Sequence, residues 1–371
     1  MSVTRRTARA TRTRVATAVV AATTAYGLVS APAATAAQQR HHWNRTLTTN
    51  VAAPFQIALS RGHVYFTDGL AGTFSRITRS GDQVVASAPG GEIAGAELSP
   101  DGRTMAFTTL DYATGAATLT IRRAGRADVV ADLGGYEAAQ NPDGAQTYGL
   151  VAGGNPCAEQ VLSELTGGPA TYTGMVDSHP YAVSSLPGGA WAVADAGGND
   201  ILRVSATGQV STLSVLPPQP ITLTADQVHA LGAPDCLIGV TYAFEPVPTD
   251  VERDAHGRLF VSTLPGGPED ASLGARGSVY RVWQGGSQRV VTGFLGAADL
   301  AVAPSGTIFV AELFNGRIAR YADGRITTAV RYGSPVSVEV HGDFLYIGMM
   351  GTIDVTTGEV LSPGKVSRVR I

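Results

Sequence analysis

Apolar and polar residues alternate in short runs along most of the chain, and turns rich in glycine, asparagine and aspartate separate these runs. The segment VADAGGNDILRV (Val193–Val204) is typical, because two alternating runs flank a small polar centre, and this predicts a β-hairpin. No long segment has the i, i+3, i+4, i+7 apolar spacing of an amphipathic helix. The pattern therefore predicts an all-β protein.

This hairpin belongs to a unit that recurs six times, with copies beginning at Pro54, Ala94, Pro180, Pro248, Ala297 and Pro335. Each copy has a short strand, a tight turn such as SPDG or APSG, a second strand such as WAVAD or IFVAE, and two further strands joined by turns. Four short strands that repeat in register predict one propeller blade. We expect a six-bladed β-propeller of NHL/SMP-30-like architecture with four-stranded antiparallel blades. A β-sandwich is the alternative, but it would not repeat the same turns in register.

The N-terminus has the pattern of a secretory signal peptide over residues 1–37. Five arginines precede the uncharged run Val15–Val29, and the small residues APAATAA follow it. The apolar run is short for a membrane span, so we predict a secreted protein without a membrane anchor. Residues 38–50 are predicted to be a flexible tail, and residues 51–371 a single propeller domain.

Composition and charge narrow the choice of partner. The chain has 45 glycines, 20 prolines and only 15% charged residues, which suits a turn-rich β protein. Removal of the five signal-peptide arginines, with no acids, takes the formal charge from −3 to −8. An acidic exported chain argues against nucleic acid as a partner. We expect a monomer whose partner is an unknown small molecule or an extracellular protein.

Three segments resemble the secreted ScyD/ScyE family of bacterial propellers: YEAAQNPDG (Tyr136–Gly144), DSHPYAVSSLPGGAWAVADAGGNDILRV (Asp177–Val204) and PTDVERDAHGRLFVSTLPG (Pro248–Gly266). The chain departs from the family at His179, where the family has asparagine, and at Ala182, where it has glycine. The resemblance implies an exported six-bladed propeller. It implies no particular reaction, because fold alone does not specify chemistry.

Two long links interrupt the repeats, at residues 134–176 and 217–245, and both flank the third blade on the same face. Each link contains one of the two cysteines, Cys157 and Cys236. In an oxidising compartment a lone pair predicts one disulfide, and two buried free thiols are the alternative.

Alignment of the inner strands on their turn glycines places one residue of each blade at the mouth of the central channel: Gln56, Gly95, Ala182, Asp250, Asp299 and Ser337. Asp250 and Asp299 lie on neighbouring blades, and Asp177 and His179 open the third inner strand. These four residues are candidate ligands for Ca²⁺ or another divalent cation. Alternatively, Asp250 and Asp299 cap backbone amides at strand starts, and His179 is a turn residue.

A second group of candidates precedes the third blade on the loop-rich face. Tyr136, Glu137, Asn141 and Asp143 could reach over the channel, and with His179 they form the candidate ligand-binding set. The alternative for NPDG is a plain turn.

Motifs for nucleophiles, zinc helices and phosphate-binding loops are absent from the sequence. The sequence therefore favours a propeller that binds an unknown small ligand or partner at the loop-rich face of its channel. The alternative is a metal-dependent hydrolase or lyase of the lactonase or streptogramin-lyase kind, so whether the protein is an enzyme stays open.

Overall fold

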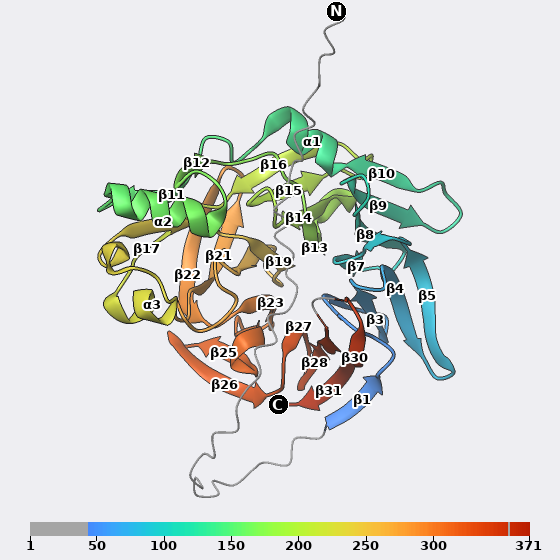
Figure 1. Cartoon of the computed structure of the whole chain (residues 1–371). Coiled ribbons are helices and arrows are strands. Elements are labelled where there is room, and N and C mark those ends of the chain that lie inside the picture. Colours follow the sequence, from blue (N-terminus) through green and yellow to red (C-terminus); the bar gives the residue numbers. More distant parts are fainter. Residues whose placement is uncertain (1–43, 355–356) are drawn as a thin grey trace, which may run out of the picture.

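The computed structural model describes residues 44–354 and 357–371, and within them six β-sheets are arranged as blades around a central axis (Figure 1). Each blade is antiparallel and four strands deep, and the inner edge of blade two is divided into two short strands. The predicted six-bladed propeller is confirmed.

The strands follow the order of the sequence repeats. Blade one comprises β2 (Ile57–Ser60), β3 (His63–Asp68), β4 (Thr73–Thr78) and β5 (Gly81–Ser87), and blade two comprises β6 (Gly91–Glu92), β7 (Ala96–Leu98), β8 (Thr104–Asp111), β9 (Ala117–Arg123) and β10 (Val129–Asp132). Blade three comprises β13 (Pro180–Ser185), β14 (Trp191–Asp195), β15 (Asp200–Val204) and β16 (Val210–Val215), and blade four comprises β19 (Pro248–Arg253), β20 (Leu259–Thr263), β21 (Gly277–Trp283) and β22 (Gly286–Phe294). Blade five comprises β23 (Ala297–Val302), β24 (Ile308–Glu312), β25 (Arg317–Ala322) and β26 (Arg325–Arg331), and blade six comprises β27 (Pro335–His341), β28 (Phe344–Met349), β31 (Lys365–Arg370) and β1 (Asn44–Thr48).

Burial along the strands explains the hydrophobic pattern. Every residue of β14 is buried, because the side chains on its two faces pack against blades two and four. The outer strand β26 has no fully buried residue, and four of its seven residues are exposed. Second strands such as β14 therefore have near-continuous apolar runs, whereas outer strands are largely polar.

The hydrophobic core is divided among the interfaces between blades. In the described part of the chain, six apolar clusters each join two neighbouring blades, and Trp191, Leu119 and Leu202 lie in the cluster between blades two and three. Because every blade shares its core with both neighbours, the ring is one packed unit.

The N-terminal side of the described chain closes this ring. β1 pairs antiparallel with β31 and becomes the outer strand of blade six, with Asn44 opposite Val369. Residues 38–50 are expected from the sequence to be a flexible tail, and for residues 44–48 the structure differs from that expectation. The physical reason is that β31 would otherwise have an unpaired edge, which β1 satisfies. The predicted signal peptide and the start of the tail lie outside the described residues.

The two long links are more ordered than loops. Together they form a seventh sheet, in the order β12 (Thr171–Thr173), β11 (Thr147–Ala152), β18 (Thr241–Phe244) and β17 (Gln219–Thr222). Helices α2 (Pro156–Thr166) and α3 (Ala225–Ala230) accompany it at the left of Figure 1. The sheet has its own apolar cluster, which includes Leu162, Val228 and Leu237. Helix α1 (Leu133–Gln140) begins the first link.

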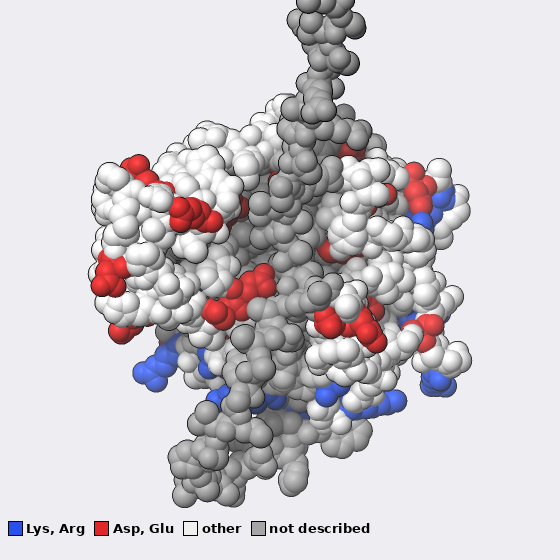
Figure 2. Space-filling model, viewed as in Figure 1, with Lys and Arg blue, Asp and Glu red and all other residues white. Residues whose placement is uncertain are grey.

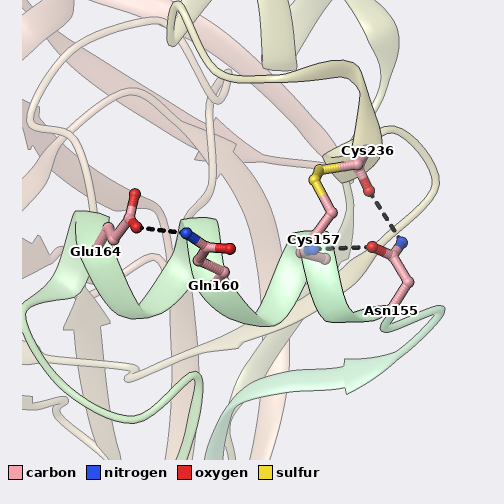
Figure 3. The surroundings of a disulfide bond; sticks show 6 residues. Asn155, Cys157, Gln160, Glu164 and Cys236 are labelled. Atoms are coloured by element: carbon pink, nitrogen blue, oxygen red, sulfur yellow. Dashed lines mark hydrogen bonds between the residues drawn. A yellow bond between two sulfur atoms is a disulfide. The ribbon is translucent and has the colours of Figure 1, made fainter.

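The predicted disulfide joins the two links. Cys157 at the start of α2 is bonded to Cys236, with their Cα atoms 6.2 Å apart (Figure 3). Asn155 supports the same junction, because its side chain accepts a hydrogen bond from the Ala158 amide and donates one to the Cys236 carbonyl. Among the described residues, no helix combines the length and the apolar character that a membrane span requires.

Candidate functional site

The inner strands β2, β7, β13, β19, β23 and β27 surround the central channel. Successive side chains of a strand point to opposite sides, so residues two apart in sequence face the channel at successive depths. The channel is therefore lined by two layers of side chains, which we call the aspartate layer and the glutamate layer.

The aspartate layer is the one predicted by the repeat alignment. Gln56 extends across it: its Nε2 donates to the Val183 carbonyl at 3.2 Å and lies 3.5 Å from Oδ1 of Asp250. Its Oε1 accepts the Ala96 amide at 2.8 Å. Gly95 leaves the space for this arrangement, since a Cβ there would lie only 2.8 Å from Cα of Ala182.

Asp250 connects its blade to the next one by a hydrogen bond, whereas Asp299 has an oxygen without a partner. The Leu300 amide of the next blade donates to Oδ2 of Asp250 at 3.2 Å, as the Ala96 amide does to Gln56. This resembles the predicted capping role, except that the amide belongs to the neighbouring blade. Oδ1 of Asp299 has no hydrogen-bond partner, although Asp299 is only 3% exposed.

The two aspartates are close enough to affect each other's ionisation. Burial raises the pKa of Asp250 to about 7. Burial, followed by the charges of Asp250 and Glu339, raises the pKa of Asp299 well above its ordinary value. Proximity of the two acids, expected from the sequence, is therefore present.

The glutamate layer lies two residues further along the inner strands. Glu97, Glu252 and Glu339 come from blades two, four and six, and one carboxylate oxygen of each lies within 4.8 Å of the others. Two oxygens on opposite sides of a bound Ca²⁺ are separated by about the same distance, because each Ca–O bond is roughly 2.4 Å. Burial raises the pKa of Glu339 to about 8. In the described part of the chain, this is the one set of three acids, histidines or cysteines that meets this distance.

This layer is not among the residues predicted from the sequence, because an alignment of one residue per blade does not include it. The signal was present two residues on, where AEL, VER and VEV place glutamate in alternate blades. Their convergence depends on ring closure, which linear spacing does not show.

The loop-rich end of the channel is closed by apolar side chains. Phe55 and Tyr181 lie with their ring centroids 5.2 Å apart, in a cluster that includes Val247 and Val336. Register shifts at Tyr181 and Val336 have the form of β-bulges, which re-aim side chains. Asp250 is 1% exposed, whereas the three glutamates are half-buried, so we infer that water reaches the channel from the glutamate end.

The four predicted metal ligands do not form one site. Among the described residues, no three of Asp177, His179, Asp250 and Asp299 bring ligand atoms within 4.8 Å of one another. Nε2 of His179 lies 2.7 Å from Oε1 of Glu92, whose Oε2 accepts the Tyr112 hydroxyl at 2.6 Å. Burial lowers the pKa of His179, but the hydrogen bond and charge of Glu92 outweigh burial and raise it overall. Asp177 is exposed. His179 is instead engaged by a carboxylate of blade two, and cation binding by these four residues stays a prediction.

The four candidate ligand-binding residues of the first link also differ in their surroundings. The Tyr136 hydroxyl lies 2.8 Å from Oγ1 of Thr212, and its side chain packs on the core between blades two and three. Asn141 ends α1 in a left-handed conformation, and its Nδ2 donates to the Gly174 carbonyl at 3.1 Å. The Gly144 amide donates to the Asn141 carbonyl, so NPDG is the turn that the alternative predicted. Glu137 and Asp143, in contrast, are fully buried.

The surface offers one further feature. A cleft of about 390 Å³ lies between blades six and one, where Asn50, Asp68 and Asp82 are among the lining residues. None of the predicted ligand-binding residues lines it. On the face shown in Figure 2, acidic side chains lie on both sides of the ring centre, whereas Lys and Arg gather mainly along the lower edge.

Comparison with known proteins supports the fold. No protein-family model and no curated protein matches the chain. Among solved structures, an aldose sugar dehydrogenase from Streptomyces coelicolor in its PQQ-bound form is 14% identical, with a TM-score of 0.52 over 90% of this chain and 100% of that one. A gluconolactonase from Xanthomonas campestris is 10% identical, with a TM-score of 0.51 over 89% and 90%. A streptogramin B lyase is 13% identical, with a TM-score of 0.50 over 89% and 97%. At these identities the likeness establishes the propeller architecture only.

Proposed function

We propose that this protein is an exported, monomeric propeller of the ScyD/ScyE kind that binds a divalent cation in its central channel and an unknown small ligand or extracellular partner there. The observation that carries the proposal is the convergence of Glu97, Glu252 and Glu339, whose oxygens lie within 4.8 Å of one another. Three carboxylates at this separation repel one another unless they are protonated or share a cation. Oxygen ligands favour Ca²⁺, Mg²⁺ or Mn²⁺.

The aspartate layer adds the charges of Asp250 and Asp299 to the same channel, and Oδ1 of Asp299 is a buried acceptor without a donor, so the channel as a whole favours a cation. Since apolar side chains close the loop-rich mouth, we put the binding centre at the glutamate layer and not at the mouth. Export is supported by the basic and apolar N-terminal pattern and by the Cys157–Cys236 bond.

The test is calorimetric titration of chelator-treated mature protein with Ca²⁺, beside the variants Glu252→Gln and Glu339→Gln. We expect each variant to weaken calcium binding in the channel at least tenfold, because each removes one charged ligand. Glu164→Gln on the exposed side of α2 is the matched control and should bind as the unaltered protein does. Equal binding by all four proteins would refute a channel cation.

A second function, a metal-dependent hydrolase or lyase, is favoured by one observation. Asp250 lies beside Asp299 in the channel, burial raises its pKa to about 7, and a carboxyl group with a raised pKa is suited to proton transfer. Calcium-dependent turnover of a panel of lactones and esters, abolished in Asp250→Asn, would support it. No turnover by the calcium-loaded protein would leave the binding function as the proposal.

A further inference from the structure

A second group of acids lies outside the channel, where α1 and the NPDG turn meet blade three. It consists of Glu137 from α1, Asp143 from the turn, and Asp195 and Asp200 from the β14–β15 hairpin, and each is at most 1% exposed. Five carboxylate oxygens of this group have no hydrogen-bond partner: both of Glu137, both of Asp200 and Oδ1 of Asp143. Buried carboxylates without partners are strongly unfavourable unless a positive charge compensates them.

The repeats provide an internal comparison. The last residue of a blade's second strand lies opposite the first residue of its third strand, so the two side chains are on the same face. In blade five this pair is Glu312 opposite Arg317, and the guanidinium group donates to the carboxylate. In blade three the same pair is Asp195 opposite Asp200, two acids. Blade five therefore places the positively charged Arg317 beside Glu312, whereas blade three places a second carboxylate, that of Asp200, beside Asp195.

Hydrogen-bond donors around these four acids satisfy only some of their carboxylate oxygens. Asp195 accepts hydrogen bonds from the Ser178 hydroxyl and from the amides of His179 and Gly198. Oδ2 of Asp143 accepts the hydroxyl of Tyr148 and the amide of Asn199, each at 3.0 Å. No Lys or Arg in the described residues forms an ion pair with any of the four acids, and His179 is engaged with Glu92.

Two further observations concern the surroundings of the Glu137 carboxylate. At Gly198 a Cβ would lie 3.3 Å from Oε2 of Glu137, so glycine keeps this side of the carboxylate open. Oδ1 of Asn141, at the end of the same helix, is buried and also has no partner. The Asp177 backbone lies near Glu137, but neither carboxylate oxygen accepts a well-formed hydrogen bond.

We propose that Glu137, Asp143 and Asp200 bind a second divalent cation of the Ca²⁺ class, which fastens α1 and the first link to blade three. Oxygen-only donors with net negative charge are the set that calcium prefers. In this structure the oxygens of the three acids do not all lie within 4.8 Å of one another, so the side chains have to move inward to share one ion. The bound ion takes the position in blade three that the guanidinium group of Arg317 occupies in blade five. This site goes beyond the proposed channel function and does not depend on it.

The experiment measures the number of bound calcium ions per chain by elemental analysis after equilibrium dialysis of the mature protein. We expect two ions for the unaltered protein and for Glu164→Gln. Asp200→Asn should bind one, and so should Glu137→Gln, a conservative second variant in case the first does not fold. Glu252→Gln removes the channel ion alone and separates the two sites.

A local readout completes the test. With calcium, amide hydrogen exchange in residues 133–173 should slow at least tenfold in the unaltered protein and in Glu252→Gln, but not in Glu137→Gln. The proposal is overturned if Glu137→Gln and Asp200→Asn keep the full calcium count, or if calcium leaves exchange in this segment unchanged. Loss of the channel ion in Glu252→Gln bears only on the proposed function.

Discussion

Individual acids at the ends of second strands hold the links between blades. Asp68 accepts the amides of Ala52, Ala53 and Ala71, and Asp195 accepts three donors from the link and turn beside it. Glu312 accepts the Leu295 amide and is paired with Arg317. The same position in three blades therefore accepts hydrogen bonds from the chain as it enters the inner strand of that blade.

This arrangement makes Arg317 important for stability. Arg317→Ala leaves Glu312, which is fully buried, without its cation, and we expect a loss of about 3 kcal/mol in the free energy of unfolding. Urea denaturation measures it. The exposed Arg325→Ala in the same blade is the control and should lose less than about 0.5 kcal/mol. Equal losses in the two variants would show that the ion pair contributes nothing.

Buried carboxyl groups make the stability of the calcium-free protein depend on pH. Burial raises the pKa of Glu137 and Glu339 to about 8 and that of Asp250 to about 7. A carboxyl group whose pKa is higher in the folded than in the unfolded chain holds its proton more tightly when folded, so folding is disfavoured as pH rises. In chelator, the thermal midpoint should fall between about pH 5 and about pH 8.

Calcium should reduce this fall, since it stabilises the ionised form. The double variant Glu137→Gln, Glu339→Gln should show a shallower pH dependence in chelator than the unaltered protein. Differential scanning fluorimetry across the pH range checks both expectations. A midpoint that rises with pH in chelator would contradict the raised pKa values.

At the scale of elements, the two links depend on each other more than on the ring. β11 and β12 of the first link pair with β18 and β17 of the second, and the Cys157–Cys236 bond joins the adjoining helical segments (Figure 3). The sheet is a separate layer beside blades three and four, with its own small core. Its stability is therefore more sensitive to the disulfide than that of the blades.

Replacement of both cysteines by serine should loosen this sheet locally. The bond closes a loop of 79 residues, for which the chain-entropy model gives at most about 4.5 kcal/mol. Limited proteolysis should cut the variant first within α2 and around Cys236, while the blades remain associated. Peptide mapping without reductant should recover the linked pair from the unaltered protein. Cleavage that begins in the blades would contradict a local effect.

For the whole molecule, ring closure depends on a short strand far from its partner in sequence. β1 pairs with β31, and Leu47 packs on the cluster between blades six and one. Because each blade shares its core with two neighbours, an opening at this interface weakens the entire ring.

Two truncated chains test this closure. A chain that begins at Asn44 should unfold in one transition near the midpoint of the mature protein. A chain that begins at Asn50 lacks β1, and its midpoint should be lower by roughly 5 °C or more, as expected for a loss of several hydrogen bonds and apolar contacts. Calorimetry of the two chains compares them directly. Identical midpoints would mean that β1 does not close the ring.

The sequence by itself determined the blades, because strand alternation and turn chemistry are local properties that repeat in register. It also identified the disulfide, the Asp250–Asp299 pair and the buried Glu137 and Asp143 among its candidates. Tertiary structure alone brought Glu97, Glu252 and Glu339 together, engaged His179 with Glu92, and combined the two links into one sheet. These contacts join residues from different blades or links. They depend on how the ring closes and which side of each strand faces the axis, and neither is encoded in the spacing along one segment.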